Sequence, residues 1–378
     1  MLVQKPYTIP LDAGKLEVYT EPSSYLMSGL LDFASRENPN RAYLFVSKIL
    51  GKYIPCRPSA MRQSYQDLNA KISLTGDALV FGVAETATGL GAGIADEIDR
   101  NSDLNIYYSQ STRFQSSKPL AFSIDESHSH APQHLIYDMA NRIDLSSIEE
   151  VLLVDDEITT GNTLNKITRN MQEYLPNLKR IHWVSLVNWM SKGRCDYFKE
   201  QNSSVELYYY SLMKGEFRFK HSSSKDISFP KSTATDLSPA ICRYDIGRTG
   251  IKVSELRNFV FLSEDSEVMS YCEFAKNEQY VVIGTGEFTY HPFLFAEAME
   301  TAGYDVLFLS TGRSPILQGG GISSRLKFYN PTDNANYYLY NLPENRTPII
   351  FYETFNQYNE CPLHRQLNCK AAILGNAQ

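Results

Sequence analysis

Several features that would narrow the function of this 378-residue chain are missing from its sequence. Its six cysteines include no C-x-x-C pair, so we expect reduced thiols and no structural metal. The G-x-x-x-x-G-K-[ST] motif is absent, which argues against a P-loop nucleotide site. The chain also lacks an internal repeat with a period of about 20 to 50 residues, as repeat architectures have.

Targeting and membrane signals are missing as well. The chain does not start with a basic segment followed by an apolar one, and no apolar run is long enough to span a bilayer. Lys and Arg number 36 against 43 Asp and Glu, and the net charge of −7 argues against nucleic acid or an anionic membrane as a partner. We expect a soluble, cytoplasmic protein of two domains.

The most informative stretch runs from Val151 to Thr163 and reads Val-Leu-Leu-Val-Asp-Asp-Glu-Ile-Thr-Thr-Gly-Asn-Thr. The four apolar residues 151–154 predict a strand that is covered on both faces of a parallel sheet. Asp155 and Asp156 follow at its carboxyl end, where ligands of such sheets bind. Because carboxylates accept hydrogen bonds and are hard-oxygen ligands, this pair predicts a site for vicinal ribose hydroxyls, directly or through hydrated Mg²⁺.

The loop after the two carboxylates has the composition of a phosphate site. It opens a helix, and helix N-termini direct backbone N–H groups toward anions. Its glycine lets the backbone approach an anion closely, and its three threonine hydroxyls add donors. The residues with this predicted role are Thr159, Thr160, Gly161, Asn162 and Thr163.

Three other interpretations of residues 151–163 fit less well. A Walker B strand also ends in acids, but it works with the P-loop motif that the chain lacks. A response-regulator receiver domain can begin with Val-Asp-Asp-Glu, yet it has no need of the Thr-Thr-Gly-Asn-Thr tail. A plain structural turn would tolerate many sequences that lack this grouping of acids, glycine and hydroxyls.

The same stretch resembles the phosphoribosyl pyrophosphate (PRPP) loop of the type I phosphoribosyltransferases, with four hydrophobic residues, two acids and a Thr-Thr-Gly-x-Thr tail. The resemblance implies that the chain binds PRPP, with Asp155 and Asp156 on the ribose and residues 159–163 on the 5-phosphate. It also implies Mg²⁺ as the cofactor, bound through PRPP together with the two aspartates.

Strand-like and helix-like segments alternate along the first half of the chain, which predicts a doubly wound, mainly parallel α/β sheet. The expected strands are 78–83, 105–109, 121–124, 151–154, 180–187 and 205–210, and the expected helices are 89–100, 132–141, 162–173 and 189–200. Before them we expect strands at 16–19 and 43–46 and helices at 24–34 and 63–72. The resemblance assigns this flanking segment to an N-terminal hood over the acceptor, with Lys48 and Lys52 as candidate acceptor contacts.

A second loop of small and hydroxyl residues follows the strand expected at 78–83. In the resembled family the loop after this early strand holds the pyrophosphate of PRPP with backbone amides, and a helix start suits that role. A helix cap with close packing is the structural alternative. The Glu85 carboxylate would repel pyrophosphate unless Mg²⁺ or a water intervened. The candidate residues are Glu85, Thr86, Ala87, Thr88 and Gly89.

Residues 111–134 correspond to a mobile lid of the resembled family, which closes over the site and supplies cations to the pyrophosphate. Arg113 and Lys118 are the candidate cations. Closing a lid would keep water from the reacting ribosyl centre. The alternative is that both residues belong to a solvated loop.

Within the same segment Glu126, His128 and His130 would point to one side of an extended chain. The cluster suits acid/base chemistry or an acceptor contact, because a fourth ligand for zinc is missing. Solvated histidines beside a helix start are the alternative.

Residues 221–240 are rich in Ser, Lys, Thr, Asp and Pro, which predicts a linker. It divides the chain into a phosphoribosyltransferase domain at 1–220 and a second domain at 241–378. A βαβ-like unit predicts that the second domain is also α/β. Its expected elements are strands at 280–284 and 305–310 and a helix at 292–302.

Segments in both halves resemble a bacterial subgroup that joins a phosphoribosyltransferase domain to a C-terminal domain named for a Thr-Arg-Ser-Pro (TRSP) motif. Members occur in tellurite-resistance and stress gene clusters. The matching segments are Arg41–Pro55, Glu85–Gly91, Glu126–Ala131, Gly284–Pro292 and Ser310–Ile316. In the last segment Gly312 stands where the naming motif has Thr. The candidate anion-binding residues of this domain are Thr285, Gly286, Arg313 and Ser314, with a structural turn as the alternative for the first two.

The resemblance therefore implies a type I phosphoribosyltransferase-like fold with an N-terminal hood, followed by a second α/β domain. It implies an enzyme that transfers 5-phosphoribosyl from PRPP to a nucleobase-like or other small acceptor and releases pyrophosphate. Two alternatives stay open: a regulatory protein that senses PRPP without turnover, and a reverse pyrophosphorolysis of a nucleotide-like metabolite. The expected partners are small molecules, and a homodimer is left open.

Overall fold

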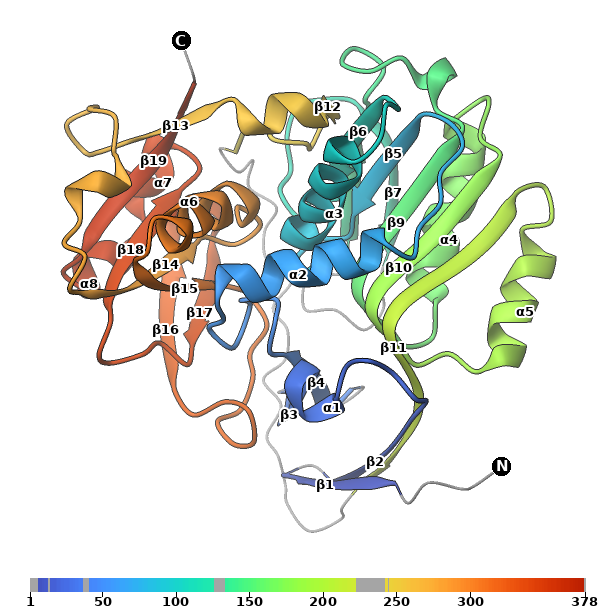
Figure 1. Cartoon of the computed structure of the whole chain (residues 1–378), viewed down its shortest axis with the longest axis horizontal. Helices are drawn as coiled ribbons and strands as arrows, with labels where there is room; N and C mark the ends of the chain where they lie inside the picture. Colours follow the sequence, from blue (N-terminus) through green and yellow to red (C-terminus); the bar gives the residue numbers. More distant parts are fainter. Residues whose placement is uncertain are drawn as a thin grey trace.

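The computed structural model describes residues 6–12, 14–36, 41–125, 133–221, 242–243 and 245–376. Two sheets with their helices lie side by side, and the hood lies below the space between them (Figure 1). No helix in these described ranges combines the length and the apolar character that a membrane crossing requires.

The first domain is built on an eight-stranded sheet with the order β1-β2-β11-β10-β9-β5-β6-β12. Its five central strands, from β11 to β6, are parallel, whereas β1, β2 and β12 pair antiparallel at the edges. The predicted doubly wound, mainly parallel sheet is thus confirmed. The strands are β1 (Tyr7–Leu11), β2 (Gly14–Thr20), β5 (Ala78–Gly82), β6 (Ile106–Gln110), β9 (Glu150–Ile158), β10 (Arg180–Asn188), β11 (Glu206–His221) and β12 (Ile251–Lys252).

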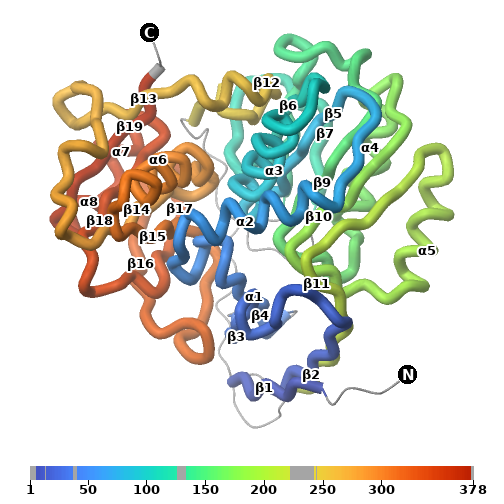
Figure 2. The backbone as a smooth tube through the Cα atoms, viewed as in Figure 1, coloured from blue at the N-terminus to red at the C-terminus, as the bar shows by residue number. Residues whose placement is uncertain are grey.

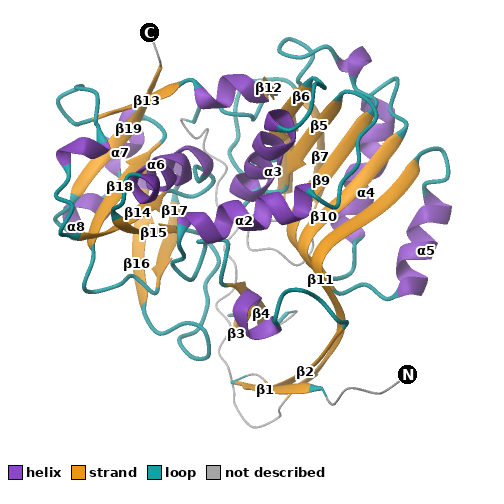
Figure 3. Cartoon of the chain, viewed as in Figure 1, coloured by secondary structure: helices purple, strands orange, loops and turns teal. Residues whose placement is uncertain are grey.

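Helices cover both faces of this sheet (Figure 3). In β9 the side chains of Leu152 and Val154 pack into one apolar cluster and those of Val151 and Leu153 into another, because successive strand residues point to opposite faces. Helices α2 and α3 contribute to the first cluster, and α4 and α5 to the second. The helices are α2 (Pro58–Asn69), α3 (Thr88–Arg100), α4 (Asn162–Tyr174) and α5 (Lys192–Gln201), with a 3₁₀ turn η1 (Leu145–Ser147).

The hood contains a strand where the sequence predicts a helix. The helix expected at 24–34 is wrong in its second half: α1 (Met27–Leu30) gives way directly to β3 (Leu31–Ser35). This strand pairs antiparallel with β4 (Tyr43–Ser47), so tertiary pairing overrides the local helix pattern. Strand β11, expected at 205–210, is longer than predicted, and its part from Gly215 onward pairs with β2.

The helix expected at 132–141 is also wrong. Strand β7 (Leu120–Asp125) forms an antiparallel hairpin with β8 (Gln133–Tyr137), which occupies that position. Leu135 and Thr112 exchange backbone hydrogen bonds in both directions at 2.9 Å. The backbone N–H and C=O groups of β8 therefore bond to β7 on one side and to Thr112 on the other, and a helix at this position could not make these bonds.

The second domain has a five-stranded sheet with the order β13-β19-β18-β14-β15, parallel except for β13. The predicted βαβ unit is formed by β14, α6 and β15. The elements are η2 (Val253–Arg257), β13 (Phe259–Leu262), η3 (Tyr271–Glu273), β14 (Gln279–Gly284), α6 (Tyr290–Thr301), β15 (Asp305–Ser310), β16 (Arg325–Asn330), η4 (Pro331–Asp333), β17 (Ala335–Tyr340), β18 (Thr347–Tyr352), α7 (Phe355–Glu360), α8 (Leu363–Gln366) and β19 (Lys370–Asn376).

The two domains are joined through helices. Helix α2 packs against both α3 of the first domain and α6 of the second, and α3 packs against α6 (Figure 2). Strand β12 belongs by sequence to the second half of the chain but pairs with β6 at the edge of the first sheet. The expected linker lies outside the described residues apart from His221, so its boundaries stay a prediction.

Candidate functional site

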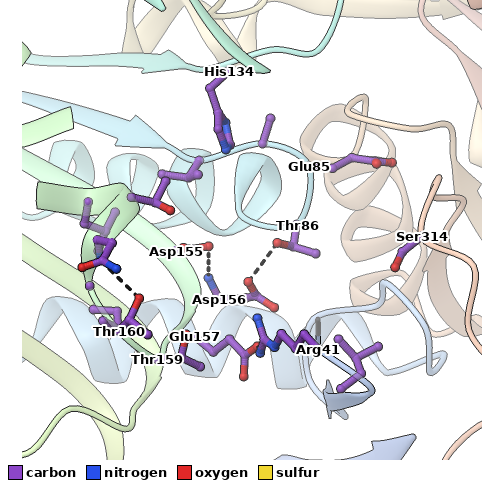
Figure 4. A pocket seen from close by; sticks show the side chains of 18 of the residues that line it. Arg41, Glu85, Thr86, His134, Asp155, Asp156, Glu157, Thr159, Thr160 and Ser314 are labelled. Carbon is purple, nitrogen blue, oxygen red and sulfur yellow. Dashed lines mark hydrogen bonds and ion pairs between the residues drawn. The ribbon is translucent and has the colours of Figure 1, made fainter. Parts of the chain in front are cut away.

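A cavity of about 200 Å³ opens at the carboxyl ends of β5 and β9. These strands form the switch point of the sheet, because β6 follows β5 on one side while β10 and β11 follow β9 on the other. Ligands of doubly wound sheets bind at such a point. The walls come from the hood, from the loops after β5 and β9, and from the loop after β15 of the second domain (Figure 4).

Asp155 and Asp156 both line this cavity. Strand β9 runs on to Ile158, so the two acids belong to the strand itself. Asp156 Oδ1 accepts a hydrogen bond from the Thr86 hydroxyl at 2.8 Å, and Asp155 Oδ1 accepts one from the Asp156 N–H at 3.0 Å (Figure 4). The loop after β5 is thereby bonded to the carboxyl end of β9.

All five residues of the predicted phosphate loop, 159–163, line the same cavity. Gly161 has a φ of 74° and immediately precedes α4, whose first turn directs backbone N–H groups toward the loop. A Cβ at Gly161 would lie 2.7 Å from the sulfur of Met190, so a side chain is excluded by space as well as by conformation. Arg194 braces the loop by donating from Nε to the Thr160 carbonyl at 3.2 Å.

Glu85 lines the cavity but its carboxylate is held by the opposite wall. Lys52 Nζ donates to Oε1 at 3.1 Å, and the backbone N–H of Arg313 donates to Oε2 at 3.4 Å. Burial raises the pKa of Glu85, but the charges of Lys52 and Arg313 outweigh it and lower the pKa. These two partners offset the repulsion that Glu85 would exert on a pyrophosphate. The peptide bond between Ala84 and Glu85 is cis.

Two residues of this loop, Thr88 and Gly89, contact the second domain. Thr86 lines the cavity, whereas Ala87, Thr88 and Gly89 do not. The Thr88 hydroxyl donates to the Glu287 carbonyl at 3.0 Å, and a Cβ at Gly89 would lie 2.7 Å from the Thr289 hydroxyl. These contacts involve side-chain positions, so the predicted role of the backbone amides of residues 87–89 in pyrophosphate binding stays a prediction.

Of the two candidate lid cations, only Arg113 lines the cavity. Its Nη2 lies 2.9 Å from His134 Nε2, and its backbone N–H donates to Glu287 Oε1 at 2.7 Å. The buried His134 lies 3.0 Å from the Ser111 hydroxyl through Nδ1 and also lines the cavity. Lys118 is exposed and is not part of the cavity wall.

Lys48 and Lys52 do not line the cavity. Lys48 donates to the Ser28 carbonyl at 3.0 Å within the hood. Lys52 is buried, and besides Glu85 it donates to the carbonyls of Gly286 and Thr311 at 3.0 and 2.7 Å. Its ammonium therefore fastens the hood to the second domain.

The cluster of Glu126, His128 and His130 lies outside the described residues, and its predicted role stays a prediction.

The cavity contains three charged residues that the sequence did not single out. Glu157 is the third acid after the strand core, and it pairs with Arg41 of the hood. Burial, together with the charge of Asp156, raises the pKa of Glu157 although Arg41 acts to lower it. Arg36, at the end of β3, also lines the cavity. The Asp-Asp-Glu run was a signal for Glu157, but nothing local in the sequence distinguishes the two hood arginines.

The four residues of the candidate anion site in the second domain lie in two different places. Arg313 and Ser314 line the transferase cavity. Thr285 and Gly286 bond within their own domain, where the Thr285 hydroxyl donates to the Phe351 carbonyl and the Gly286 N–H donates to the Thr311 hydroxyl, both at 2.9 Å. A structural turn accounts for this second pair.

Asp155 and Asp156 form a donor set that fits Mg²⁺. This ion is usually held by one or two carboxylates together with substrate phosphates. Among the described residues, no three His, Cys, Asp or Glu side chains are arranged to hold a metal by themselves. A Mg²⁺ ion at the two aspartates would take its other ligands from substrate and water.

Two family models match the chain in succession. One described as phosphoribosyl transferase matches residues 30–216, and one described as the TRSP domain C-terminal to it matches residues 245–364. The chain belongs to this family of two-domain proteins. The expected fold, a type I phosphoribosyltransferase-like domain with a hood followed by a second α/β domain, is confirmed for it.

Solved structures similar to part of this TRSP-domain protein include two adenine phosphoribosyltransferases. The one from Trypanosoma brucei is 13% identical, with a TM-score of 0.34, and the match covers 55% of this chain and 86% of that one. The one from Giardia lamblia is 14% identical, with a TM-score of 0.33 and coverages of 51% and 91%. Identities this low say nothing of the substrate. No curated protein matches the chain.

Proposed function

We propose that the protein transfers the 5-phosphoribosyl group of PRPP to a small acceptor and releases pyrophosphate. One observation carries the proposal. The two aspartates, the threonine loop 159–163 and the Glu85–Thr86 loop line one cavity at the switch point of the sheet. Ribose, 5-phosphate and pyrophosphate are each matched there by groups of suitable chemistry, and the phosphoribosyl transferase family supports the same reaction.

In the proposed reaction an atom of the acceptor forms a bond to C1 of the ribose, and the bond from C1 to the pyrophosphate oxygen breaks. Pyrophosphate leaves with the electron pair, and the acceptor loses its proton to solvent. Asp155 and Asp156 hold the ribose hydroxyls, and residues 159–163 hold the 5-phosphate. Arg113 faces the leaving pyrophosphate. Bound Mg²⁺ supplies neutralisation of the charge that develops on the leaving group.

The residues contribute positioning and electrostatics rather than a covalent intermediate. Arg113 is suited to the task because two neighbours orient it. Its guanidinium lies against His134, and its backbone is held by Glu287 of the second domain. A cation that is oriented before the substrate binds needs little reorganisation during the reaction.

The test is PRPP binding by calorimetry with Mg²⁺ present. The double substitution Asp155→Asn with Asp156→Asn keeps the shape of both side chains but removes their charge, and we expect it to abolish Mg²⁺-dependent binding. Asp103→Asn, at an exposed position outside the cavity, is the control and should bind as the native chain does. Unchanged affinity in the double variant would refute the proposal.

Pyrophosphate release separates turnover from sensing. The native chain with PRPP, Mg²⁺ and a panel of small acceptors should release pyrophosphate with at least one of them. Tight PRPP binding without release across a broad panel would favour the alternative, a regulatory protein that senses PRPP.

A further inference from the structure

The second domain contributes part of the wall of the transferase cavity. Arg313 and Ser314 follow β15 and line the same cavity as Asp155 and Asp156. Two contacts hold this segment against the first domain. The Arg313 N–H donates to Glu85 Oε2, and the Ser314 hydroxyl accepts from Arg36 Nη2 at 3.0 Å. The C-terminal domain is thus placed to contact a substrate of the first domain.

The guanidinium of Arg313 is fixed in orientation. Nε donates to the Tyr337 hydroxyl at 2.9 Å and Nη2 to Asp333 Oδ2 at 2.7 Å. Its central carbon lies 4.9 Å from the ring centroid of Phe114 and 5.4 Å from that of Tyr337. Within the described part of the chain Nη1 has no hydrogen bond to protein, so this edge of the cation is left for a ligand.

This cation lies away from the predicted phosphate loop. In Figure 4, Ser314 and Glu85 lie on the side of the cavity opposite Thr159 and Thr160. Arg36 reaches this side from the hood, and its backbone forms an isolated bridge with Ile316, two residues beyond Ser314. The 5-phosphate has its own groups at the other end, and the ribose has Asp155 and Asp156 between the two ends (Figure 4). The pyrophosphate is assigned to Arg113 and the Glu85–Thr86 loop. The wall formed by Arg313, Ser314 and Arg36, between hood and second domain, is therefore where an acceptor would enter.

The donors at this end suit a carboxylate. A guanidinium presents a planar fork that matches the two oxygens of a carboxylate, and the bonds are strengthened by charge. Arg313, Arg36 and Ser314 all line the cavity, and Arg36 Nη2 donates to the Ser314 hydroxyl, so two cations and one hydroxyl belong to this part of its wall. A fixed, partly desolvated cation favours an anion over a neutral carbonyl.

We infer that the acceptor carries a carboxylate, which Arg313 of the C-terminal domain binds together with Arg36 and Ser314. The inference rests on the proposed function and names the class of its acceptor. Through Arg313 and Ser314 the C-terminal domain determines specificity in a reaction whose other groups belong to the first domain.

Matched pairs of compounds test the inference: nicotinate with nicotinamide, orotate with uracil, and anthranilate with aniline. Each pair has a similar ring and differs in the carboxylate. Binding to the full chain saturated with PRPP and Mg²⁺ is measured by calorimetry, and turnover by pyrophosphate release. We expect at least one acid to bind or react at least tenfold better than its partner. If PRPP binds but every acid fails, or the neutral partner does equally well, the carboxylate assignment is overturned. If PRPP itself fails to bind, the proposed function falls instead.

Substitution of Arg313 tests which residue is responsible. Arg313→Lys keeps the charge and the fold but loses the planar fork, and we expect about a tenfold weaker affinity for the preferred acid, with PRPP affinity within twofold of native. Arg218→Gln, on the exposed part of β11, removes a cation that does not line the cavity and serves as control. Thermal unfolding of each variant shows that the fold is intact. A loss of PRPP affinity equal to the loss for the acid would assign Arg313 to pyrophosphate and overturn the inference.

Discussion

Arg248 provides the sharpest test of how the two domains are joined. It is fully buried and lies between two carboxylates of the second domain. Nη1 donates to Glu353 Oε1 at 2.6 Å, and Nη2 donates to Glu353 Oε2 and Glu287 Oε2, both at 3.1 Å. Nε lies 3.3 Å from the Thr112 hydroxyl of the first domain. Burial lowers the pKa of Arg248, but the charges of Glu353 and Glu287 outweigh it and raise the pKa.

Substitution Arg248→Met removes this cation and leaves both carboxylates buried. Breaking a buried ion pair by removing one partner costs about 3–5 kcal/mol, because the remaining charge is uncompensated. Here the carboxylates keep other donors: Glu287 retains the Thr112 hydroxyl and the Arg113 N–H, and Glu353 retains a backbone N–H. We therefore expect the lower end of that range, about 3 kcal/mol of unfolding free energy at pH 7.

Urea unfolding followed by circular dichroism measures this loss. Arg142→Met is the matched control, since Arg142 is exposed and lies 3.9 Å from an exposed carboxylate, and its loss should stay within about 0.5 kcal/mol. A loss below about 1 kcal/mol would refute the view that Arg248 compensates two buried charges.

Two further predictions concern the pH dependence of stability. Burial lowers the pKa of His291 to about 4 from 6.5. Between these two values the unfolded state binds more protons than the folded state, so the free energy of unfolding should fall by about 3 kcal/mol as the pH drops from 6.5 to 4. In urea unfolding measured across this pH range, His291→Gln should remove that fall. Burial raises the pKa of Glu150, but hydrogen bonds from His182 and Thr75 outweigh it and lower the pKa to about 2 from 4.5. The ionised carboxylate therefore contributes about 3 kcal/mol to the free energy of unfolding above pH 4.5, and this contribution should be lost as the pH falls toward 2. Glu150→Gln should abolish this loss of stability at low pH, whereas Glu216→Gln, at an exposed position, should keep it. If Glu150→Gln lost stability toward pH 2 as the native chain does, Glu150 would not be the group responsible.

Strands β5 and β9 could be predicted from sequence because residues 78–81 and 151–154 are apolar at every position. Strands β5 and β9 are buried on both faces, and a continuous apolar run is the pattern of such strands. The errors lie where pairing partners are distant in sequence. Strand β8 satisfies its backbone on β7 and on Thr112, and β3 on β4, contacts that no local pattern of residues contains.

The candidate site divides in the same way. Asp155, Asp156 and the loop 159–163 are contiguous, and their chemistry could be recognised from one stretch of sequence. The cavity also takes residues from the hood and from the second domain, such as Arg36 and Arg313. These residues become neighbours only through the packing of the domains, so the sequence could suggest Arg313 as an anion ligand but not as a part of the transferase cavity.

The second sheet explains why its domain completes the first site. Its own switch point lies between β14 and β18, since β15 follows β14 on one side and β19 follows β18 on the other. A doubly wound domain would bind a ligand at the carboxyl ends of these strands. Here Glu287 and Glu353 follow those ends and hold Arg248.

Glu287 also accepts hydrogen bonds from the Thr112 hydroxyl and the Arg113 N–H. A residue at the switch point of the second sheet therefore binds the loop that carries Arg113. Glu85 makes the reciprocal contact, since it reaches from the first domain to the N–H of Arg313. Each domain thus uses a carboxylate to position an arginine of the cavity wall. A change at either carboxylate should therefore alter substrate binding as well as the association of the domains.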